Sequence, residues 1–341
     1  MIGIAFEGGG TRGSYQIGSY LAFLDCHIKP NGVCGTSIGS FNAAMIAAGQ
    51  EKELLKFWEE IDVSELLDLQ HLKKIKLGNV SKAVSSVFGI LKNKGIDTTK
   101  LCNAVDKVLD RDKLYNSKMD YGLVTVQLNT LKPVYKYKED IPKSKIIDYI
   151  LASCYLPVFK MEKIIDENYY LDGGFYDNSP VDLLVKKKYK KIYVVRLNGI
   201  GVKRKRPKGV EIIDIKPSRS LGGTITLKQE KIRENIKLGY FDTLKVLKNY
   251  DGKKFLFKVR PDWYYNMLIK KVDEKLLKRV SKFWETDSAK EMILKSLEFI
   301  MREEKISYFN VYSPYGLVKL VKKAYNKKYF IYKFIKSLKF I

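Results

Sequence analysis

The stretch IGIAFEGGGTRGSYQIG, residues 2–18, carries the pattern from which the fold is inferred. A short apolar run meets three glycines, then an arginine, another glycine and a segment of helical composition. The spacing of Gly8, Gly10 and Gly13 satisfies G-x-G-x-x-G, the dinucleotide-binding fingerprint. A glycine-rich turn between a strand and a helix also suits any anion that must lie against bare backbone N–H groups. The stretch therefore predicts an α/β unit with an anion-binding turn, and the anion is either a cofactor phosphate or an oxyanion formed during a reaction.

The composition is that of a folded protein with an unusual charge. Hydrophobic residues make up 45% and charged residues 30% of the 341 residues, which are ordinary values for a globular chain. Lys and Arg number 63 against 38 Asp and Glu, which gives a formal net charge of +25. This excess predicts an anionic partner, either nucleic acid or a membrane surface. The alternative is a soluble protein whose lysines are simply solvated.

Strand-like and helix-like segments alternate in the first half of the chain. Strand-like runs fall at residues 2–6, 33–34, 121–128, 133–137 and 191–197, and helical segments at 14–24 and 40–49. Residues 51–114 have a Lys-rich helical pattern with a break at 95–97, where Asp97 or Thr98 is a candidate N-cap. This alternation predicts an α/β sheet that is covered by helices on both faces.

The composition changes after about Tyr250. Residues 270–285 and 289–304 have amphipathic helical patterns, and the final stretch is more basic still. We therefore predict one domain over residues 1–250 and a helical, Lys-rich C-terminal region over residues 251–341.

A second glycine pattern, GTSIG at residues 35–39, has the form G-x-S-x-G. In serine hydrolases this pattern makes a tight elbow between a strand and a helix, and its glycines allow the backbone to crowd while the serine is presented to substrate. Gly35 and Gly39 flank Ser37 between a short apolar run and a helix of small residues. Ser37 is therefore a candidate nucleophile, and the alternative is a glycine-rich turn in which Ser37 caps a helix.

A serine nucleophile needs a base, and histidine is the usual one. The chain has two histidines, His27 in a short polar connection and His71 in a Lys-rich helical stretch, and neither has a motif around it. A carboxylate that acts directly as the base is the remaining option. Asp172 follows a strand-like run and precedes Gly173 and Gly174, so it is the candidate base. The alternative is an Asp-Gly turn in which the carboxylate bonds its own backbone.

The three motifs EGGGTRG, GTSIG and DGG stand in this order along the chain, and together they resemble the patatin-like phospholipase family. The resemblance extends to ASCYLPVF at residues 152–159, NSP at 178–180 and KLGY at 237–240, and it covers roughly residues 1–250. It implies a three-layer α/β/α sandwich with a mostly parallel central sheet, to which the helical basic extension is added.

The resemblance also implies which anion the glycine loop holds. In this family the backbone N–H groups of Gly8, Gly9 and Gly10, with their neighbours Thr11 and Arg12, would stabilise a tetrahedral oxyanion. Arg12 would be a fixed positive charge that holds the loop or an anionic head group. Glu7 stands where the family often has Asp. A dinucleotide site would need a strand that ends in an acidic residue about 20 positions past the glycines, and Asp25, the nearest acid, is followed by the proline-containing CHIKPNG.

The resemblance implies hydrolysis of fatty acyl esters in phospholipids or related lipids, of the phospholipase A or lysophospholipase type. Ser37 would form the acyl-enzyme with Asp172 as its base, and neither a metal nor a cofactor would be required. The alternative is a catalytically silent patatin fold that binds lipid or membrane as a scaffold.

The basic C-terminal tail and one basic loop are candidates for the contact with an anionic membrane surface. In residues 317–341, apolar side chains share spacings compatible with one helical face, and lysines fall around the other sides. A basic amphipathic helix of this kind lies on a membrane surface; the alternative is a helix packed onto the protein. The apolar positions are Leu317, Leu320, Ala324, Ile331, Phe334 and Leu338. The loop is VKRKRPKG at residues 202–209. No helix-turn-helix, RNP strand or zinc module is present, so nucleic acid is not the expected partner.

The expected location is cytoplasmic, with peripheral membrane association. The N-terminus reads directly as a strand rather than a signal peptide. No uncharged apolar stretch approaches the ~18 residues of a spanning helix. Four scattered cysteines without C-x-x-C spacing predict buried thiols rather than a disulfide frame or a zinc site.

Overall fold

The computed structural model describes residues 1–66, 95–325 and 327–339. The chain divides into two compact units, Met1–Thr243 and Leu244–Ile341, which are described in turn.

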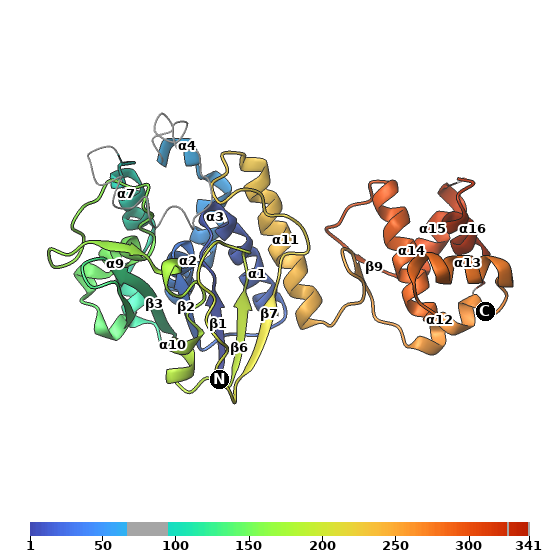
Figure 1. Cartoon of the computed structure of the whole chain (residues 1–341), viewed down its shortest axis with the longest axis horizontal. Coiled ribbons are helices and arrows are strands. Elements are labelled where there is room, and N and C mark those ends of the chain that lie inside the picture. Colours follow the sequence, from blue (N-terminus) through green and yellow to red (C-terminus); the bar gives the residue numbers. More distant parts are fainter. Residues whose placement is uncertain (67–94, 326, 340–341) are drawn as a thin grey trace. The chain divides into compact units, whose positions relative to one another are not determined.

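The first unit is built on a mostly parallel sheet whose strands lie in the order β4-β3-β2-β1-β6-β7, with β5 paired to β3 (Figure 1). The pairs β1–β2, β1–β6, β2–β3 and β6–β7 are parallel, whereas β4 and β5 run antiparallel to β3. The strands are β1 Ile2–Phe6, β2 Gly32–Thr36, β3 Asp120–Gln127, β4 Lys132–Tyr137, β5 Tyr170–Asp172, β6 Lys191–Val195 and β7 Glu211–Ile215. The predicted strands are confirmed. The edge strand β7 was missed, because a half-buried run of five residues after a basic loop gives little periodic signal.

Helices cover both faces of this sheet, as the sequence predicted. Helix α10 packs on one face, where Leu183 and Leu184 join Ala5, Cys34 and Val194 in a buried cluster. Helices α2 and α9 pack against β2 and β3, and α1 contacts α2 and α3. The helices are α1 Ser14–Asp25, α2 Ile38–Ala47, α3 Glu51–Glu60, α4 Val63–Leu66, α7 Thr99–Val108, α8 Arg111–Asn116, α9 Ile146–Ser153, α10 Val181–Lys186 and α11 Gln229–Leu247. Short 3₁₀ turns lie at Gly10–Gly13, Lys138–Asp140, Lys143–Lys145 and Gly173–Phe175.

Helices α1 and α11 touch at glycines. A Cβ on Gly239 would lie 1.9 Å from the carbonyl oxygen of Tyr15, and one on Gly18 would lie 1.8 Å from that of Ile236. The backbones therefore approach more closely than any side chain permits. This contact accounts for the glycine of the KLGY segment.

We expect Gly239→Ala to destabilise the first unit by about 1–3 kcal/mol or more, because the added methyl group must force two buried helices apart. Urea unfolding followed by circular dichroism measures the loss. The matched control is Gly316→Ala in α15, where the nearest atom to the new Cβ is 3.8 Å away. The control should be neutral or slightly stabilising, and equal effects of the two changes would contradict the packing argument.

The second unit is a helical domain with a two-stranded sheet. Its helices are α12 Asp262–Ile269, α13 Glu274–Trp284, α14 Ala289–Glu303, α15 Pro314–Ala324 and α16 Phe330–Ser337, and parallel strands β8 Leu256–Phe257 and β9 Val311–Tyr312 form the sheet. Helices α13 and α14 confirm the two predicted amphipathic segments. A core of its own fills this unit, with Phe257, Tyr265 and Leu297 almost fully buried.

The predicted single amphipathic helix at the C-terminus is wrong. The chain makes two helices, α15 and α16, and both pack against α14 and against each other. Leu317, Ile331, Phe334 and Leu338 are buried in the core of the unit, and of the six predicted apolar positions only Leu320 and Ala324 are exposed. Packing against the other helices removes more apolar surface from water than an isolated helix would. The two helices therefore pack into the unit with their apolar sides and leave their lysines exposed. Within the described ranges, no helix combines the length and the apolar character that crossing a bilayer requires.

Candidate active site

Ser37 occupies a strained elbow between β2 and α2. Its φ and ψ are 55° and −134°, a conformation that a residue with a side chain adopts at a cost. A Cβ on Gly35 would lie 2.1 Å from the carbonyl oxygen of Gly39, and one on Gly39 would lie 2.5 Å from that of Phe6. Both flanking glycines are therefore required by close backbone approach, which is the geometry that G-x-S-x-G predicted.

Two other serines hold the elbow in place. The hydroxyl of Ser153, at the end of α9, accepts the backbone N–H of Ser37 at 2.9 Å and donates to the carbonyl of Val124 at 2.7 Å. The hydroxyl of Ser40 donates to the carbonyl of Ser37 at 2.6 Å. Ser153 belongs to the ASCYLPVF segment that resembles the family, but no role was predicted for this serine.

Asp172 ends β5, and its carboxylate lies beside the Ser37 hydroxyl, which acts to lower its pKa. Its Oδ1 accepts the N–H of Gly174 at 2.7 Å, and its own N–H donates to the carbonyl of Tyr155 at 2.8 Å. Burial raises the pKa of Asp172 to about 6, although the hydrogen bonds from Ser37 and Gly174 act to lower it. The fold thus brings together two predicted site residues that are 135 positions apart, and it makes the carboxylate a stronger base than an exposed aspartate.

The glycine loop presents fewer free N–H groups than the five predicted residues would supply. The N–H of Gly8 donates to the carbonyl of Asn178 at 3.2 Å, and that of Thr11 donates to Thr224 at 2.8 Å. For the N–H groups of Gly9 and Gly10, the described residues supply no acceptor. Gly8 instead packs against the elbow, since a Cβ there would lie 3.1 Å from the Cβ of Ser37. Two adjacent free donors on the loop that packs against the elbow are what an oxyanion would need.

Arg12 ties the glycine loop to other loops. Its Nε donates to the carbonyl of Gly222 at 3.0 Å, and its Nη1 donates to that of Asn198 at 2.9 Å. Of the two roles expected for this arginine, these contacts correspond to holding the loop.

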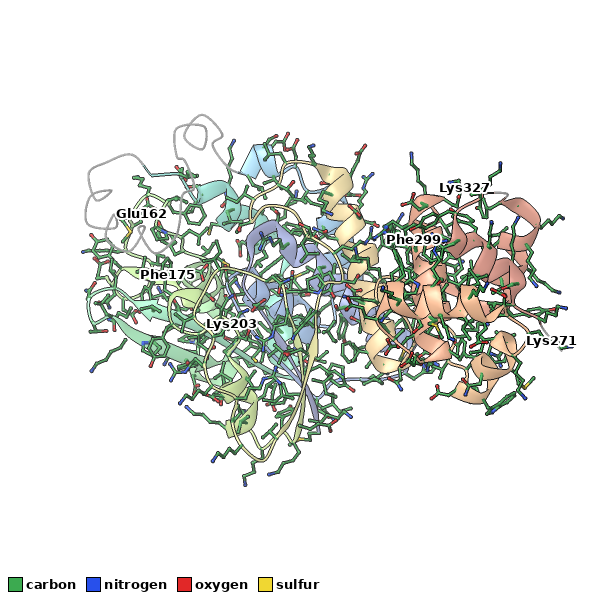
Figure 2. The ribbon with its side chains drawn as sticks, turned by 45° about the vertical axis from the view of Figure 1, so that its right-hand side comes forward. Glu162, Phe175, Lys203, Lys271, Phe299 and Lys327 are labelled. Carbon is green, nitrogen blue, oxygen red and sulfur yellow. The ribbon has the colours of Figure 1, made fainter. Side chains whose placement is uncertain are left out.

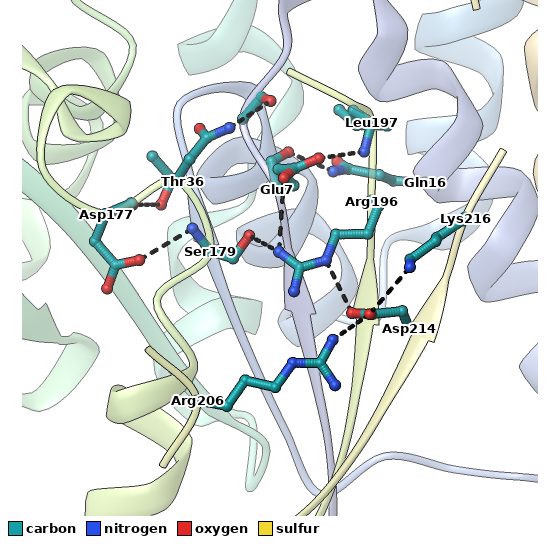
Figure 3. Close-up of polar contacts among 12 residues, drawn as sticks. Glu7, Gln16, Thr36, Asp177, Ser179, Arg196, Leu197, Arg206, Asp214 and Lys216 are labelled. Carbon is teal, nitrogen blue, oxygen red and sulfur yellow. Dashed lines mark hydrogen bonds and ion pairs between the residues drawn. The ribbon is translucent and has the colours of Figure 1, made fainter. Parts of the chain in front are cut away.

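A chain of charged side chains runs from Glu7, next to the glycine loop in the sequence, through Arg196 to Asp214 (Figure 3). The Oε2 of Glu7 accepts the N–H of Leu197 at 2.5 Å, and its Oε1 lies 3.6 Å from Arg196. Arg196 also donates to Asp214 at 2.9 Å and to the hydroxyl of Ser179 at 2.8 Å. The positive charge of Arg196 therefore balances the negative charge of Glu7. This contact was not predicted, because β7 and its Asp214 were not predicted.

Cys154 is the remaining functional group beside the dyad. Its side chain is half-buried near Ser37, Ser40 and Asp172, and desolvation together with the aspartate raises the pKa of the thiol far above its ordinary value. The thiol is therefore neutral and acts as a small packing group rather than as a nucleophile.

The two histidines complete the comparison between the predicted and the observed site. His27 is exposed in the connection between α1 and β2, where its N–H donates to the carbonyl of Leu24. His71 lies outside the described residues, as does the rest of 67–94 within the segment 51–114 that was predicted to be helical. Over residues 1–66, 95–325 and 327–339, no group of three or more His, Cys, Asp or Glu side chains could hold a metal ion.

The protein combines a mostly parallel sheet with a serine elbow at a strand end and a buried carboxylate beside that serine. These features define a serine hydrolase-like α/β protein. The model of the patatin-like phospholipase family matches residues 4–185, which is more than half of the chain, and the chain belongs to that family.

Individual relatives are more distant. The chain is 26% identical over 231 residues to the uncharacterized protein L620 of Acanthamoeba polyphaga mimivirus, an alignment that covers 52% of this chain and 62% of that protein. Among solved structures, it is similar to VipD from Legionella pneumophila, with 14% identity, a TM-score of 0.47 and coverage of 94% of this chain and 79% of VipD. It is also similar to the type III effector ExoU, with 12% identity, a TM-score of 0.35 and coverage of 98% and 73%.

Proposed function

We propose that the protein hydrolyses fatty acyl ester bonds of phospholipids or related glycerolipids through an acyl-enzyme on Ser37, without a metal. The observation that carries this proposal is a serine held in a strained elbow beside a buried carboxylate. The free N–H groups of Gly9 and Gly10 on the adjoining loop support it, and so does membership of a family of phospholipases.

In the first half of the reaction, Asp172 takes the proton of the Ser37 hydroxyl as its oxygen attacks the ester carbonyl. Negative charge then develops on the carbonyl oxygen, where the N–H groups of Gly9 and Gly10 would stabilise it; one such donor is typically worth ~3–4 kcal/mol. Protonated Asp172 gives its proton to the departing alcohol. In the second half, Asp172 takes a proton from water as the water oxygen attacks the acyl-enzyme, and it then returns that proton to the departing Ser37 oxygen as the fatty acid is released.

Positive charge supports a lipid surface as the place of action. The unit Leu244–Ile341 contains 24 Lys and Arg against 10 Asp and Glu, a net charge of +14. Each basic side chain near an anionic leaflet adds roughly 1 kcal/mol of attraction. We propose peripheral contact through exposed lysines, since the apolar side of the tail is largely buried.

The test is fatty-acid release from vesicles of phosphatidylcholine mixed with an anionic phospholipid, in the presence of EDTA. The wild-type protein should release fatty acid, Ser37→Ala should not, and the exposed-serine control Ser64→Ala should match the wild type. If neither wild type nor Ser37→Ala releases fatty acid while both bind the vesicles, the scaffold alternative replaces hydrolysis. If Ser37→Ala retains the rate, the nucleophile is wrong.

We expect activity to rise with pH through about 6, because the base must be ionised and burial raises the pKa of Asp172 to about 6. Below this value kcat/KM should fall about tenfold per pH unit, and above it the profile should level off. Initial rates on a soluble short-chain ester measure the profile, and protein returned from low to neutral pH should recover its rate. A flat profile between about pH 5 and 7 would contradict the role of Asp172.

A further inference from the structure

A basic cleft lies next to the candidate active site and is separate from it. Its volume is about 360 Å³, and neither Ser37 nor Asp172 lines it. The walls are the loop 202–207, the ends of β6 and β7, and the segment that follows the Asp-Gly-Gly turn. Six basic side chains and three carboxylates line the cleft, so its charge is positive. The basic side chains are Arg196, Lys203, Arg204, Lys205, Arg206 and Lys216.

Three of these cations share one carboxylate. Arg196, Arg206 and Lys216 all form ion pairs with Asp214, as Figure 3 shows. A single negative charge cannot balance three positive ones, and among the described residues only Arg196 pairs with a second carboxylate, that of Glu7. The floor of the cleft therefore keeps an excess of positive charge.

Two further lysines leave their charges open to a ligand. Lys203, labelled in Figure 2, and Lys205 are exposed, and neither forms an ion pair with the described residues. Of the other carboxylates in the cleft, Asp177 is occupied by the Tyr135 hydroxyl at 3.0 Å and the Ser179 N–H at 3.1 Å. A ligand with two or more negative charges would meet the unpaired lysines of the loop together with the excess positive charge of the floor.

The loop is bonded directly to the candidate catalytic elements. The N–H of Val202 donates to the carbonyl of Gly174 at 2.9 Å, and its carbonyl accepts the N–H of Asn178 at 2.9 Å. Asn178 in turn bonds Gly8 in both directions, through its backbone carbonyl at 3.2 Å and its side-chain amide at 3.3 Å. Gly174 donates to Asp172, so one residue at the base of the basic loop connects the glycine loop with the aspartate turn.

We propose that this cleft binds a phosphate-bearing dianion, and that binding orders the glycine loop and the Asp172 turn through Val202. The ligand chemistry is a phosphate monoester or diphosphate, supplied either by the head group of an anionic lipid such as phosphatidic acid or by a soluble phosphate compound. Lys203, Lys205 and Arg206 are its main contacts. The site binds its ligand whether or not Ser37 hydrolyses an ester.

Binding is tested by isothermal titration calorimetry of the full chain with inorganic pyrophosphate. We expect saturable binding that Lys203→Glu/Lys205→Glu weakens roughly tenfold or more, since two charge-assisted contacts are reversed. The matched control is Lys52→Glu/Lys56→Glu, which makes the same charge change at exposed positions of α3 that do not line the cleft. The control should bind as the wild type does. No binding, or equal weakening in both variants, would overturn the site, because equal weakening means that only the overall charge matters.

The source of the phosphate and the coupling are tested with the same proteins. Flotation compares phosphatidylcholine vesicles that contain phosphatidic acid with equally charged vesicles that contain phosphatidylserine. The ligand is a lipid if the protein prefers phosphatidic acid and pyrophosphate competes with it. Equal flotation with both lipids, alongside pyrophosphate binding, assigns the site to a soluble phosphate. Pyrophosphate should also slow amide hydrogen exchange in residues 8–13 and 173–178. Unchanged exchange at saturation would overturn the coupling.

Discussion

Replacement of Asp172 by Asn should lower fatty-acid release by roughly 10³-fold or more, while the folded protein becomes more stable at neutral pH. The amide keeps the size of the carboxylate and can accept the N–H of Gly174, which Asp172 now accepts at 2.7 Å. It cannot take the proton of Ser37, and His27, the histidine within the described residues, is exposed in the connection between α1 and β2. Removal of the base or of its orienting partner in serine hydrolases has effects of this size.

The stability gain follows from the burial of a charge. The pKa of Asp172 rises from 3.8 to about 6 on folding, so the folded state holds the proton more tightly than the unfolded chain does. Folding stability therefore falls as pH rises between these two values, and at pH 7 the full cost of about 3 kcal/mol is present. The asparagine side chain of the Asp172→Asn variant carries no charge and escapes most of this cost. The difference in stability between the two proteins should disappear below about pH 4.

Rates on vesicles and thermal unfolding at pH 7 and pH 4 test both halves of this prediction. Asp112→Asn, at an exposed position on α8, is the matched control and should change neither quantity appreciably. Activity within tenfold of the wild type would remove Asp172 from the mechanism. A large loss of stability at pH 7 would show instead that the carboxylate supports the fold.

Gly10→Ala should lower kcat by about 10²–10³-fold, the loss typical of a displaced oxyanion donor. Gly10 has a φ of +59°, and a Cβ there would lie 2.2 Å from the backbone carbonyl oxygen of Thr224. This same carbonyl accepts the N–H of Thr11 at 2.8 Å, so the methyl group must push the whole loop away from its anchor. The N–H groups of Gly9 and Gly10 would then no longer point to one place.

The cost of a positive φ must be separated from this displacement. Gly49 has a φ of +68° with nothing within 4 Å of an added Cβ, so Gly49→Ala imposes only the backbone cost of about 1–2 kcal/mol. Steady-state kinetics on a soluble ester should show normal kcat for Gly49→Ala, with both variants folded by circular dichroism. If Gly10→Ala is as active as Gly49→Ala, the glycine loop does not hold the oxyanion.

Much of the fold could be predicted because it rests on local patterns. The strands at residues 2–6 and 191–195 are short apolar runs buried by helices on both faces, and such runs are visible in the sequence. The elbow at Ser37 could be predicted because the close approaches at Gly35 and Gly39 admit no side chain. The half-buried edge strand β7 gave no such signal, and the tail misled because helical spacing shows an apolar face without showing what covers it.

The sequence by itself determined where the backbone must be bare and where a serine and an aspartate stand at strand ends. These are local constraints of φ, ψ and close packing, and the sequence shows them because glycine stands at the positions where a side chain would not fit. Only the tertiary structure decided what lies between such points: the hydroxyl of Ser153 on the N–H of Ser37, Arg196 between Glu7 and Asp214, and Val202 between Gly174 and Asn178. Each of these contacts joins separate elements or loops, and their partners are chosen by how the sheet and its loops pack, a property that no local spacing records.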